Sequence, residues 1–147
     1  MRKEPKKYIL TISKKFLTGH PKAGEPTGFI DKIKSGDKIH TIRGNYELWA
    51  KRIAEIQSGE AILCIRNWSD KPYRSPQEEI VRLKRVGIQK IQLDKILGLF
   101  IDDVDSDECL KVIACKDGLS FDDFKSWFKG KLYEPHAIIH FTDFRYK

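Results

Sequence analysis

Three side chains that can act together in amide chemistry lie within residues 35–44, whose sequence is SGDKIHTIRG. Threonine is a weak nucleophile unless a base takes its proton, and a lysine can be that base once burial or a neighbouring cation lowers its pKa. Lys38 is the candidate base, and Thr41 is the candidate nucleophile or water-orienting hydroxyl. Arg43 is the candidate cation and can also hold a substrate oxygen. The segment therefore predicts a site for amide cleavage.

The same residues carry a resemblance to a known family. The pattern Gly-x-Lys-x-x-Thr-Ile-Arg at 36–43, the later Ala-x-x-Asp-Gly-Leu-Ser at 114–120 and a final strand resemble the ASCH superfamily of PUA-like domains. The chain is most similar to small bacterial members that hydrolyse N4-acetylcytidine, in which a Lys and a Thr act with a Glu. The resemblance implies Lys38, Thr41 and Asp117 as catalytic residues, with Gly36, His40 and Arg43 binding the substrate.

Two features of the sequence keep a second interpretation open. Strand alternation would put Thr41 and Arg43 on one face and Lys38 on the other, so joint action requires Lys38 to lie in the Gly36 turn, before the strand. Asp117 is also one methylene shorter than the Glu it matches, and about 1 Å of misplacement can lower a rate by roughly 100-fold. The alternative is a non-catalytic RNA-binding ASCH domain that uses the same cleft.

The distribution of charge is consistent with a polyanion or its fragments as the partner, for which RNA or a modified nucleoside is the candidate, and equally with a basic surface that only keeps the protein in solution. Residues 1–74 hold 16 Lys and Arg against 8 Asp and Glu, whereas residues 75–147 hold 12 against 13. Basic side chains gain affinity for a polyanion by releasing its counterions. Aromatic rings beside such charges can stack on bases. The candidate nucleic-acid contacts are Arg66, Trp68, Tyr73 and Arg74.

The rest of the sequence contains no pattern typical of a metal site, a cofactor site or a membrane-spanning segment. The three cysteines form no Cys-x-x-Cys pair, and His136 and His140 lack the nearby glutamate of a helical zinc motif. No apolar run approaches the ~20 residues that span a bilayer, and no signal-peptide block follows the basic start. We expect a cytoplasmic protein without a cofactor or a metal, and the sequence does not indicate an oligomeric state.

Local patterns predict several short strands interrupted by short helices. Strands are expected at 8–12, 39–43, 61–68, 80–86, 89–93 and 137–141, with a loop over 20–26. The segments 80–86 and 89–93 are either two strands or one strand bent at Gly87. Helices are expected after four candidate caps, and three of them are expected to end at a glycine, because Ser, Thr and Asn cap helix starts and Gly ends helices. These caps are Thr27, Asn45, Ser106 and Ser120, and the glycines are Gly36, Gly59 and Gly118.

This order predicts one α+β domain over residues 1–147, with 1–7 as a flexible basic arm. The first and last strands are expected to pair in a small, partly open β-barrel with short flanking helices, which is also the PUA-like architecture that the resemblance implies. A doubly wound parallel sheet is the alternative, and the irregular alternation of strands and helices disfavours it.

Overall fold

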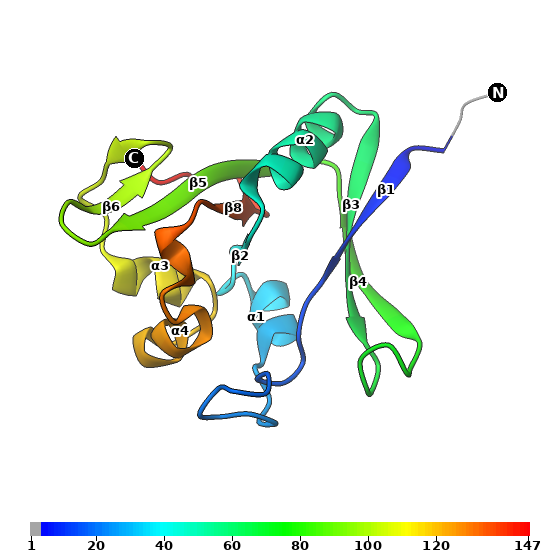
Figure 1. Ribbon diagram of the computed structural model, residues 1–147. Helices are drawn as coiled ribbons and strands as arrows, with labels where there is room; N and C mark the ends of the chain where they lie inside the picture. The colour runs from blue at the N-terminus through cyan, green and yellow to red at the C-terminus, as the bar shows by residue number, and fades with distance from the viewer. Residues whose placement is uncertain (1–3) are drawn as a thin grey trace.

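A computed structural model describes residues 4–147 (Figure 1). In this part of the chain, eight strands form two sheets and four α-helices accompany them, which confirms the α+β class. In chain order the elements are β1 (Lys6–Thr11), α1 (Phe29–Ser35), β2 (His40–Arg43), α2 (Tyr46–Gln57), β3 (Ala61–Trp68), β4 (Gln77–Leu83), β5 (Gly87–Asp94), β6 (Gly98–Ile101), β7 (Val104–Asp105), α3 (Leu110–Lys116), α4 (Phe121–Phe128), a 3₁₀ turn η1 (Lys131–Tyr133) and β8 (His136–His140).

The smaller sheet has three strands in the order β1-β3-β4. Strand β1 runs parallel to β3, with Lys6 opposite Ala61 and Thr11 opposite Arg66. Residues 61–65 are all buried, as the continuous apolar run predicts. The other neighbour, β4, is antiparallel to β3 and more exposed.

The larger sheet has five strands in the order β2-β8-β5-β6-β7. Strand β8 lies between β2 and β5, antiparallel to both, and every one of its residues is buried. Helix α2 packs between the two sheets and buries Trp49, Ile53 and Ile56 (Figure 1). Trp49 therefore belongs to the core, which the helical spacing of these three residues predicts.

Most helix ends follow the predicted local chemistry. The Asn45 and Ser120 side chains accept hydrogen bonds from the amides of Leu48 and Asp123, as caps do. Gly36 ends α1 in the left-handed conformation, with φ at 85°.

Two of the predicted caps are wrong. Gly28 occupies the N-cap of α1, so Thr27 lies one residue earlier, where its hydroxyl accepts from the amide of Phe29. Cys109 is the N-cap of α3, and the Ser106 hydroxyl instead bonds the amide of Glu108 in the preceding turn. The helices themselves form because packing of their apolar faces outweighs the cap.

The predicted strand pairing is wrong. The first and last strands lie in different sheets, because β1 is held by β3 and β8 is enclosed by β2 and β5. No closed barrel forms among residues 4–147, and the strands expected at 80–86 and 89–93 separate into the two sheets. The prediction of a basic arm fails for Lys6 and Lys7, which belong to β1, while residues 1–3 lie outside the described part.

The segment after β5 contains more structure than was predicted. Two short strands for which no expectation was stated follow β5, namely β6 at Gly98–Ile101 and β7 at Val104–Asp105, and they pair with each other. These strands are short, so their apolar side chains do not stand out in the sequence. None of the described helices has the length and apolar character that a membrane crossing requires.

We predict that the central strand β8 dominates stability. Ile138 is 0% exposed, so Ile138→Ala should lower the free energy of unfolding by about 2–5 kcal/mol through lost burial and a new cavity. Ile96 is 91% exposed, so Ile96→Ala should change that free energy by less than about 0.5 kcal/mol. Urea unfolding followed by circular dichroism measures both. Equal effects of the two substitutions would contradict the assignment of β8 to the core.

Candidate active site

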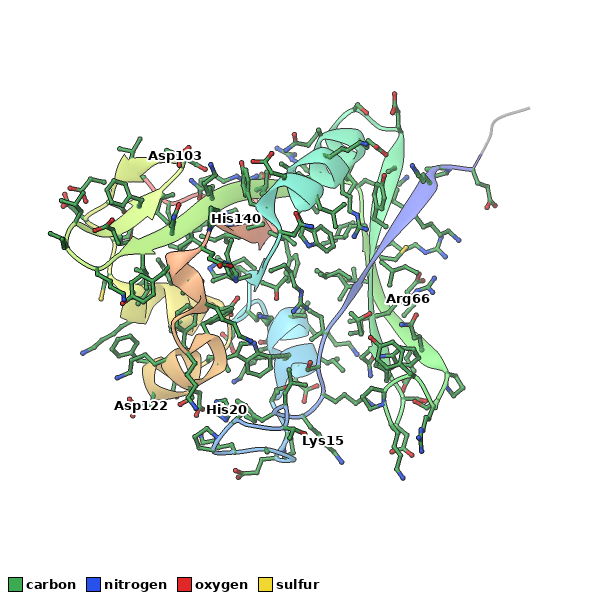
Figure 2. All side chains as sticks on the ribbon, viewed as in Figure 1. Lys15, His20, Arg66, Asp103, Asp122 and His140 are labelled. Carbon is green, nitrogen blue, oxygen red and sulfur yellow. The ribbon has the colours of Figure 1, made fainter. Side chains whose placement is uncertain are left out.

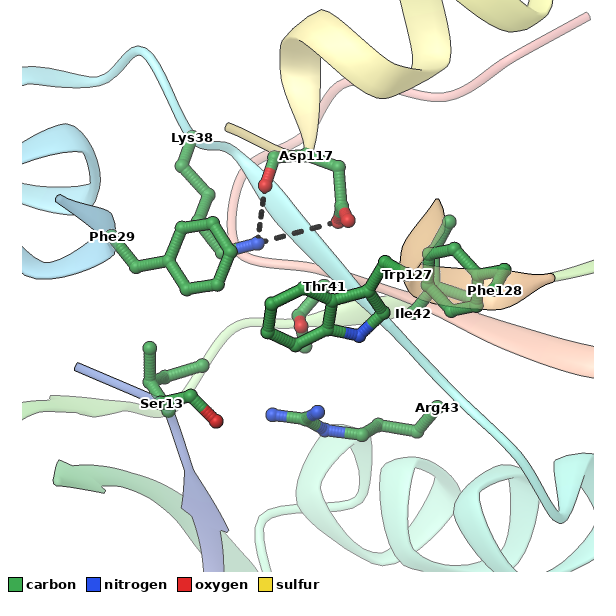
Figure 3. A pocket seen from close by; sticks show the side chains of 10 residues that line it. Ser13, Phe29, Lys38, Thr41, Ile42, Arg43, Asp117, Trp127 and Phe128 are labelled. Atoms are coloured by element: carbon green, nitrogen blue, oxygen red, sulfur yellow. Dashed lines mark hydrogen bonds and ion pairs between the residues drawn. The ribbon is translucent and has the colours of Figure 1, made fainter. Parts of the chain in front are cut away.

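The start of β2 and the end of α3 meet and bring the predicted residues together. The amide of Ile39 donates to the Lys116 carbonyl at 2.9 Å, which joins the entry of β2 to the last turn of α3. The amide of Lys38 bonds back to the Lys32 carbonyl, also at 2.9 Å. Lys38 thus precedes the strand, as joint action with Thr41 requires, and its side chain lies on the same side as those of Thr41 and Arg43 (Figure 3).

The Lys38 side chain is buried and held from two directions. Its Nζ donates to the backbone carbonyl of Asp117 at 2.6 Å and to the carboxylate Oδ1 of the same residue at 3.3 Å (Figure 3). The ammonium also lies 4.4 Å from the centre of the Phe29 ring, a cation–π contact. Lys38 is only 2% exposed. Its charge is therefore balanced by these partners and hardly at all by solvent.

Burial lowers the pKa of Lys38 from 10.5 to about 8. Asp117 opposes this change because a carboxylate favours the charged ammonium, whereas the guanidinium of Arg43 adds to it. A lysine with a pKa of about 8 loses its proton far more readily near neutral pH than a solvated one. This is the electrostatic condition under which Lys38 can act as a base.

Asp117 continues into a buried hydrogen-bond chain that ends at the C-terminal segment. Its Oδ1 lies 3.1 Å from Nδ1 of His40, and Nε2 of His40 lies 2.6 Å from the hydroxyl of Tyr146. A carboxylate can only accept, so Nδ1 carries a hydrogen, and in the neutral imidazole Nε2 then accepts from the Tyr146 hydroxyl. The carboxylate oxygen is thereby held between His40 and Lys38.

The structure gives His40 and Gly36 roles different from the predicted contact with a substrate. His40 is 0% exposed and both of its ring nitrogens are bonded within the protein, so it positions Asp117. Gly36 does not line the cavity beside Thr41; it ends α1 and turns the chain so that Lys38 enters before β2.

Arg43 is partly buried at the wall of the site. Its Nη2 donates to the backbone carbonyl of Thr11 at 2.7 Å, which ties β2 to the end of β1. Burial lowers the pKa of Arg43, and Asp117 partly offsets the effect, but a guanidinium stays charged throughout the physiological range. A guanidinium has five donors, so Arg43 keeps others for a ligand.

The cavity enclosed by these residues is small. Its volume is about 10 Å³, and the lining consists of Ile12, Ser13, Phe29, Lys38, Thr41, Ile42, Arg43, Asp117, Trp127 and Phe128. About 10–15 Å³ on this measure accommodates one water molecule, so a nucleoside does not fit beside Thr41 in this conformation. The residues of the predicted cleft between β2 and Asp117, with Arg43 at its wall, thus enclose a space of about one water molecule.

Two aromatic side chains that no motif in the sequence singles out, Phe29 and Trp127, also line the cavity. Phe29 covers Lys38, and the indole of Trp127 packs against Phe29 with ring centres 5.6 Å apart. Trp127 is only half-buried, and it separates the small cavity from a larger one of about 420 Å³. Tyr146 was also missed, because a single tyrosine near the end of the chain has no local pattern. Only tertiary contacts reveal these three roles.

The predicted nucleic-acid residues lie elsewhere, on β3 and the loop that follows it (Figure 2 labels Arg66). The Trp68 and Tyr73 rings are 5.0 Å apart, and Tyr73 is 88% exposed. Arg74 is exposed, whereas Arg66 is half-buried, 3.9 Å from Glu79, with its Nε unpartnered within residues 4–147. None of these four residues lines the cavity around Thr41.

The remaining histidines and cysteines do not line the cavity around Thr41. His140 is fully buried, and burial, together with His40 and Arg145, lowers its pKa to about 3, so the ring is neutral. Cys64 is buried, as a structural cysteine should be, but Cys109 and Cys115 are exposed. Over residues 4–147, no three His, Cys, Asp or Glu side chains gather as metal ligands.

Comparison with known protein families, curated proteins and solved structures gave no match to this chain.

We predict that the Tyr146 hydroxyl stabilises the buried chain of hydrogen bonds. Tyr146→Phe removes the only donor to Nε2 of His40 among the described residues, and a buried polar atom left unpaired costs about 1–3 kcal/mol. Tyr133→Phe is the matched control, since Tyr133 is exposed. Its effect should be below about 0.5 kcal/mol. Thermal and urea unfolding measure both, and equal stability of the two variants would show that the Tyr146 bond contributes nothing.

Proposed function

We propose that this protein is an amidohydrolase of the PUA-like ASCH type, which removes the acyl group from N4 of an acylated cytidine. One observation carries the proposal. The Lys38 ammonium is buried against Asp117, with a pKa of about 8, in a cavity that Thr41 and Arg43 also line. The motif in the sequence supplies the substrate class, and we place the activity in the cytoplasm.

The residues suggest a two-step reaction. Neutral Lys38 takes the proton of the Thr41 hydroxyl as its oxygen attacks the acyl carbon, and Arg43 stabilises the negative charge on the carbonyl oxygen. The bond from carbon to N4 then breaks, and the Lys38 ammonium returns the proton to N4, releasing cytidine. Water hydrolyses the acylated Thr41 and frees the carboxylic acid. A variant of this scheme has Thr41 orient a water that attacks directly.

Asp117 acts on Lys38 through position and charge. Although it is shorter than glutamate, its carboxylate reaches Nζ of Lys38 at 3.3 Å because it lies at the end of α3, directly beside the start of β2. The backbone carbonyl oxygen and Oδ1 of Asp117 both accept from Nζ and so orient the lysine side chain. The shorter side chain thus remains compatible with the role of the matching glutamate as an orienting group.

A ligand requires the site to open. The cavity of about 10 Å³ has to join its neighbour of about 420 Å³, and the two share Ile42, Arg43, Trp127 and Phe128 as walls. Trp127 is half-buried. A rotation of its indole would connect the two spaces, and the larger one falls within the usual range of roughly 300–1,000 Å³ for ligand pockets.

We predict that hydrolysis of N4-acetylcytidine depends on Thr41 and Lys38. Thr41→Val keeps the shape but removes the hydroxyl, and Lys38→Met removes the base, so each should lower kcat by about 100-fold or more. Lys34→Met, which alters an exposed lysine of α1, should leave kcat unchanged. Chromatographic measurement of cytidine release tests all three. Full turnover by Thr41→Val would remove Thr41 from the reaction.

The pH dependence of the reaction follows from the same pKa. Lys38 can accept a proton only when neutral, and its neutral fraction grows as the pH rises through about 8. We therefore expect kcat/KM to increase about tenfold per pH unit below 8 and to level off above it. A rate that falls over the same range would show that a protonated group is needed instead.

A second candidate function is RNA binding without chemistry, and the exposed Tyr73 ring beside the half-buried Trp68 favours it. An exposed tyrosine beside a second ring and next to Arg74 offers a base a stacking surface and a phosphate a charge. This surface does not include the Thr41 cavity.

We predict that the salt dependence of RNA affinity distinguishes the stacking residue Tyr73 from the phosphate-binding residue Arg74. Tyr73→Ala should weaken binding of single-stranded RNA by about 1–3 kcal/mol through lost stacking, with little change in salt dependence. Arg74→Ala should flatten the slope of log affinity against log salt by about 0.7 if it contacts a phosphate. Tyr133→Ala serves as the control for an exposed ring. Fluorescence anisotropy at several salt concentrations measures these effects, and RNA binding that is absent at low salt would exclude this function.

A further inference from the structure

A second cavity of about 420 Å³ lies directly beside the candidate active site. It shares Ile42, Arg43, Trp127 and Phe128 with the small cavity around Thr41. Its other walls come from the loop after β1, the end of β2, the end of α4, the turn η1 and the start of β8, and the polar side chains that matter among them are His20, Lys129, Lys131 and His136. Any group of a substrate that extends from Thr41 past Arg43 would enter this space.

The lining of this second cavity is basic and contains no Asp or Glu side chain. Arg43, Lys129 and Lys131 supply three positive charges. Lys22 and Lys125 form ion pairs with Asp123 and Asp122, whereas neither Lys129 nor Lys131 has an ion-pair partner within residues 4–147. Both lysines are exposed to the solvent. A concave wall with unpaired cations attracts an anion.

The two histidines of the lining differ in what they offer. His20 is satisfied by the protein, since Nδ1 accepts from the Lys22 amide and Nε2 lies 3.1 Å from the Asp123 carbonyl. His136 lies 2.9 Å from the Glu134 carbonyl through Nδ1, which must therefore carry the hydrogen. Its Nε2 sits near Gly44, 3.7 Å from where a Cβ would lie, and has no partner in the described part of the chain. His136 thus keeps one ring nitrogen for a ligand.

Lys129 is held in an unusual backbone conformation at the rim. It ends α4 with φ at 37° and ψ at 58°, the left-handed region that favours glycine. Replacing it with glycine should relieve the backbone while removing the charge. Lys129→Gly can therefore remove the positive charge at this position without lowering the stability of the fold.

We propose that this second cavity binds a phosphate, so that the substrate is a phosphorylated nucleoside and not the free nucleoside. The inference rests on the proposed hydrolysis for the identity of the base, but the phosphate site itself rests on the basic lining. Arg43, Lys129 and Lys131 supply the charge, and Nε2 of His136, which can only accept while Nδ1 carries the hydrogen, can bond a hydroxyl of the ribose or of the phosphate monoanion. The phosphate belongs either to a free nucleotide or to an RNA chain.

The test compares three substrates that carry the same acylated base: N4-acetylcytidine, its 5′-monophosphate and a short oligoribonucleotide with one N4-acetylcytidine. The expected result is a kcat/KM at least about tenfold higher for a phosphorylated form, expressed mainly in KM. Preference for the monophosphate assigns a free nucleotide, and preference for the oligonucleotide alone assigns RNA. Equal kcat/KM for all three would overturn the proposal.

Variants show whether the second cavity is responsible. The double substitution of Lys129→Gly with Lys131→Ala should abolish the preference for the phosphorylated form, although Lys129→Gly should not lower the melting temperature. Lys125→Ala, which alters an exposed lysine of α4 outside the lining, should keep the preference. A preference that survives the double substitution would place the phosphate elsewhere.

Binding separates this proposal from the proposed hydrolysis. Calorimetry with cytidine and cytidine 5′-monophosphate requires no turnover. If no substrate is hydrolysed but the monophosphate binds at least tenfold tighter in a manner that depends on Lys129 and Lys131, the phosphate site stands and the hydrolysis falls. If N4-acetylcytidine is hydrolysed and the phosphate adds no affinity, the hydrolysis stands and the phosphate site falls.

Discussion

The burial of the Lys38 ammonium against Asp117 is the interaction on which the rest of this site depends. Removing an ammonium from water is unfavourable unless hydrogen bonds and an opposite charge replace the solvent. Here the carbonyl and the carboxylate of one residue do so, with the Phe29 ring covering the charge. Because that residue ends α3, the helix has to meet the start of β2. The contact that joins α3 to β2 therefore also positions the residues of the proposed reaction.

The hydrogen bonds that hold the Asp117 carboxylate extend beyond Lys38 to the end of the chain. His40 holds the Asp117 carboxylate, and Tyr146 holds His40 in one tautomer. Tyr146 is itself fixed by Gln89 of β5, whose side chain bonds both its amide and its carbonyl. Burial raises the pKa of the Tyr146 phenol, which keeps its hydrogen in place as a donor. The C-terminal segment thus has a direct part in orienting the candidate base.

Local sequence patterns predicted what local interactions determine. The caps Asn45 and Ser120, the glycine that ends α1 and the buried strand β3 each follow from a few neighbouring residues. Strand partners did not follow, because the pairing of β1 with β3 depends on contacts more than fifty residues apart.

The site shows the same division. Lys38, Thr41 and Arg43 lie within six residues, so their motif is visible in the sequence, and the meeting with Asp117 was expected from the family resemblance. The closure by Phe29 and Trp127 could not be predicted, since an aromatic residue on the apolar face of a helix has the same pattern whether it fills the core or covers a cavity.

The pKa of Lys38 can be measured directly. Heteronuclear NMR titration of its side-chain Cε and Nζ resonances, assigned through the loss of the signals in Lys38→Met, measures the pKa without any substrate. We expect a pKa near 8 for Lys38, well below those of the exposed lysines. A Lys38 that titrates at its ordinary value of 10.5 would contradict the buried base and the hydrolysis that depends on it.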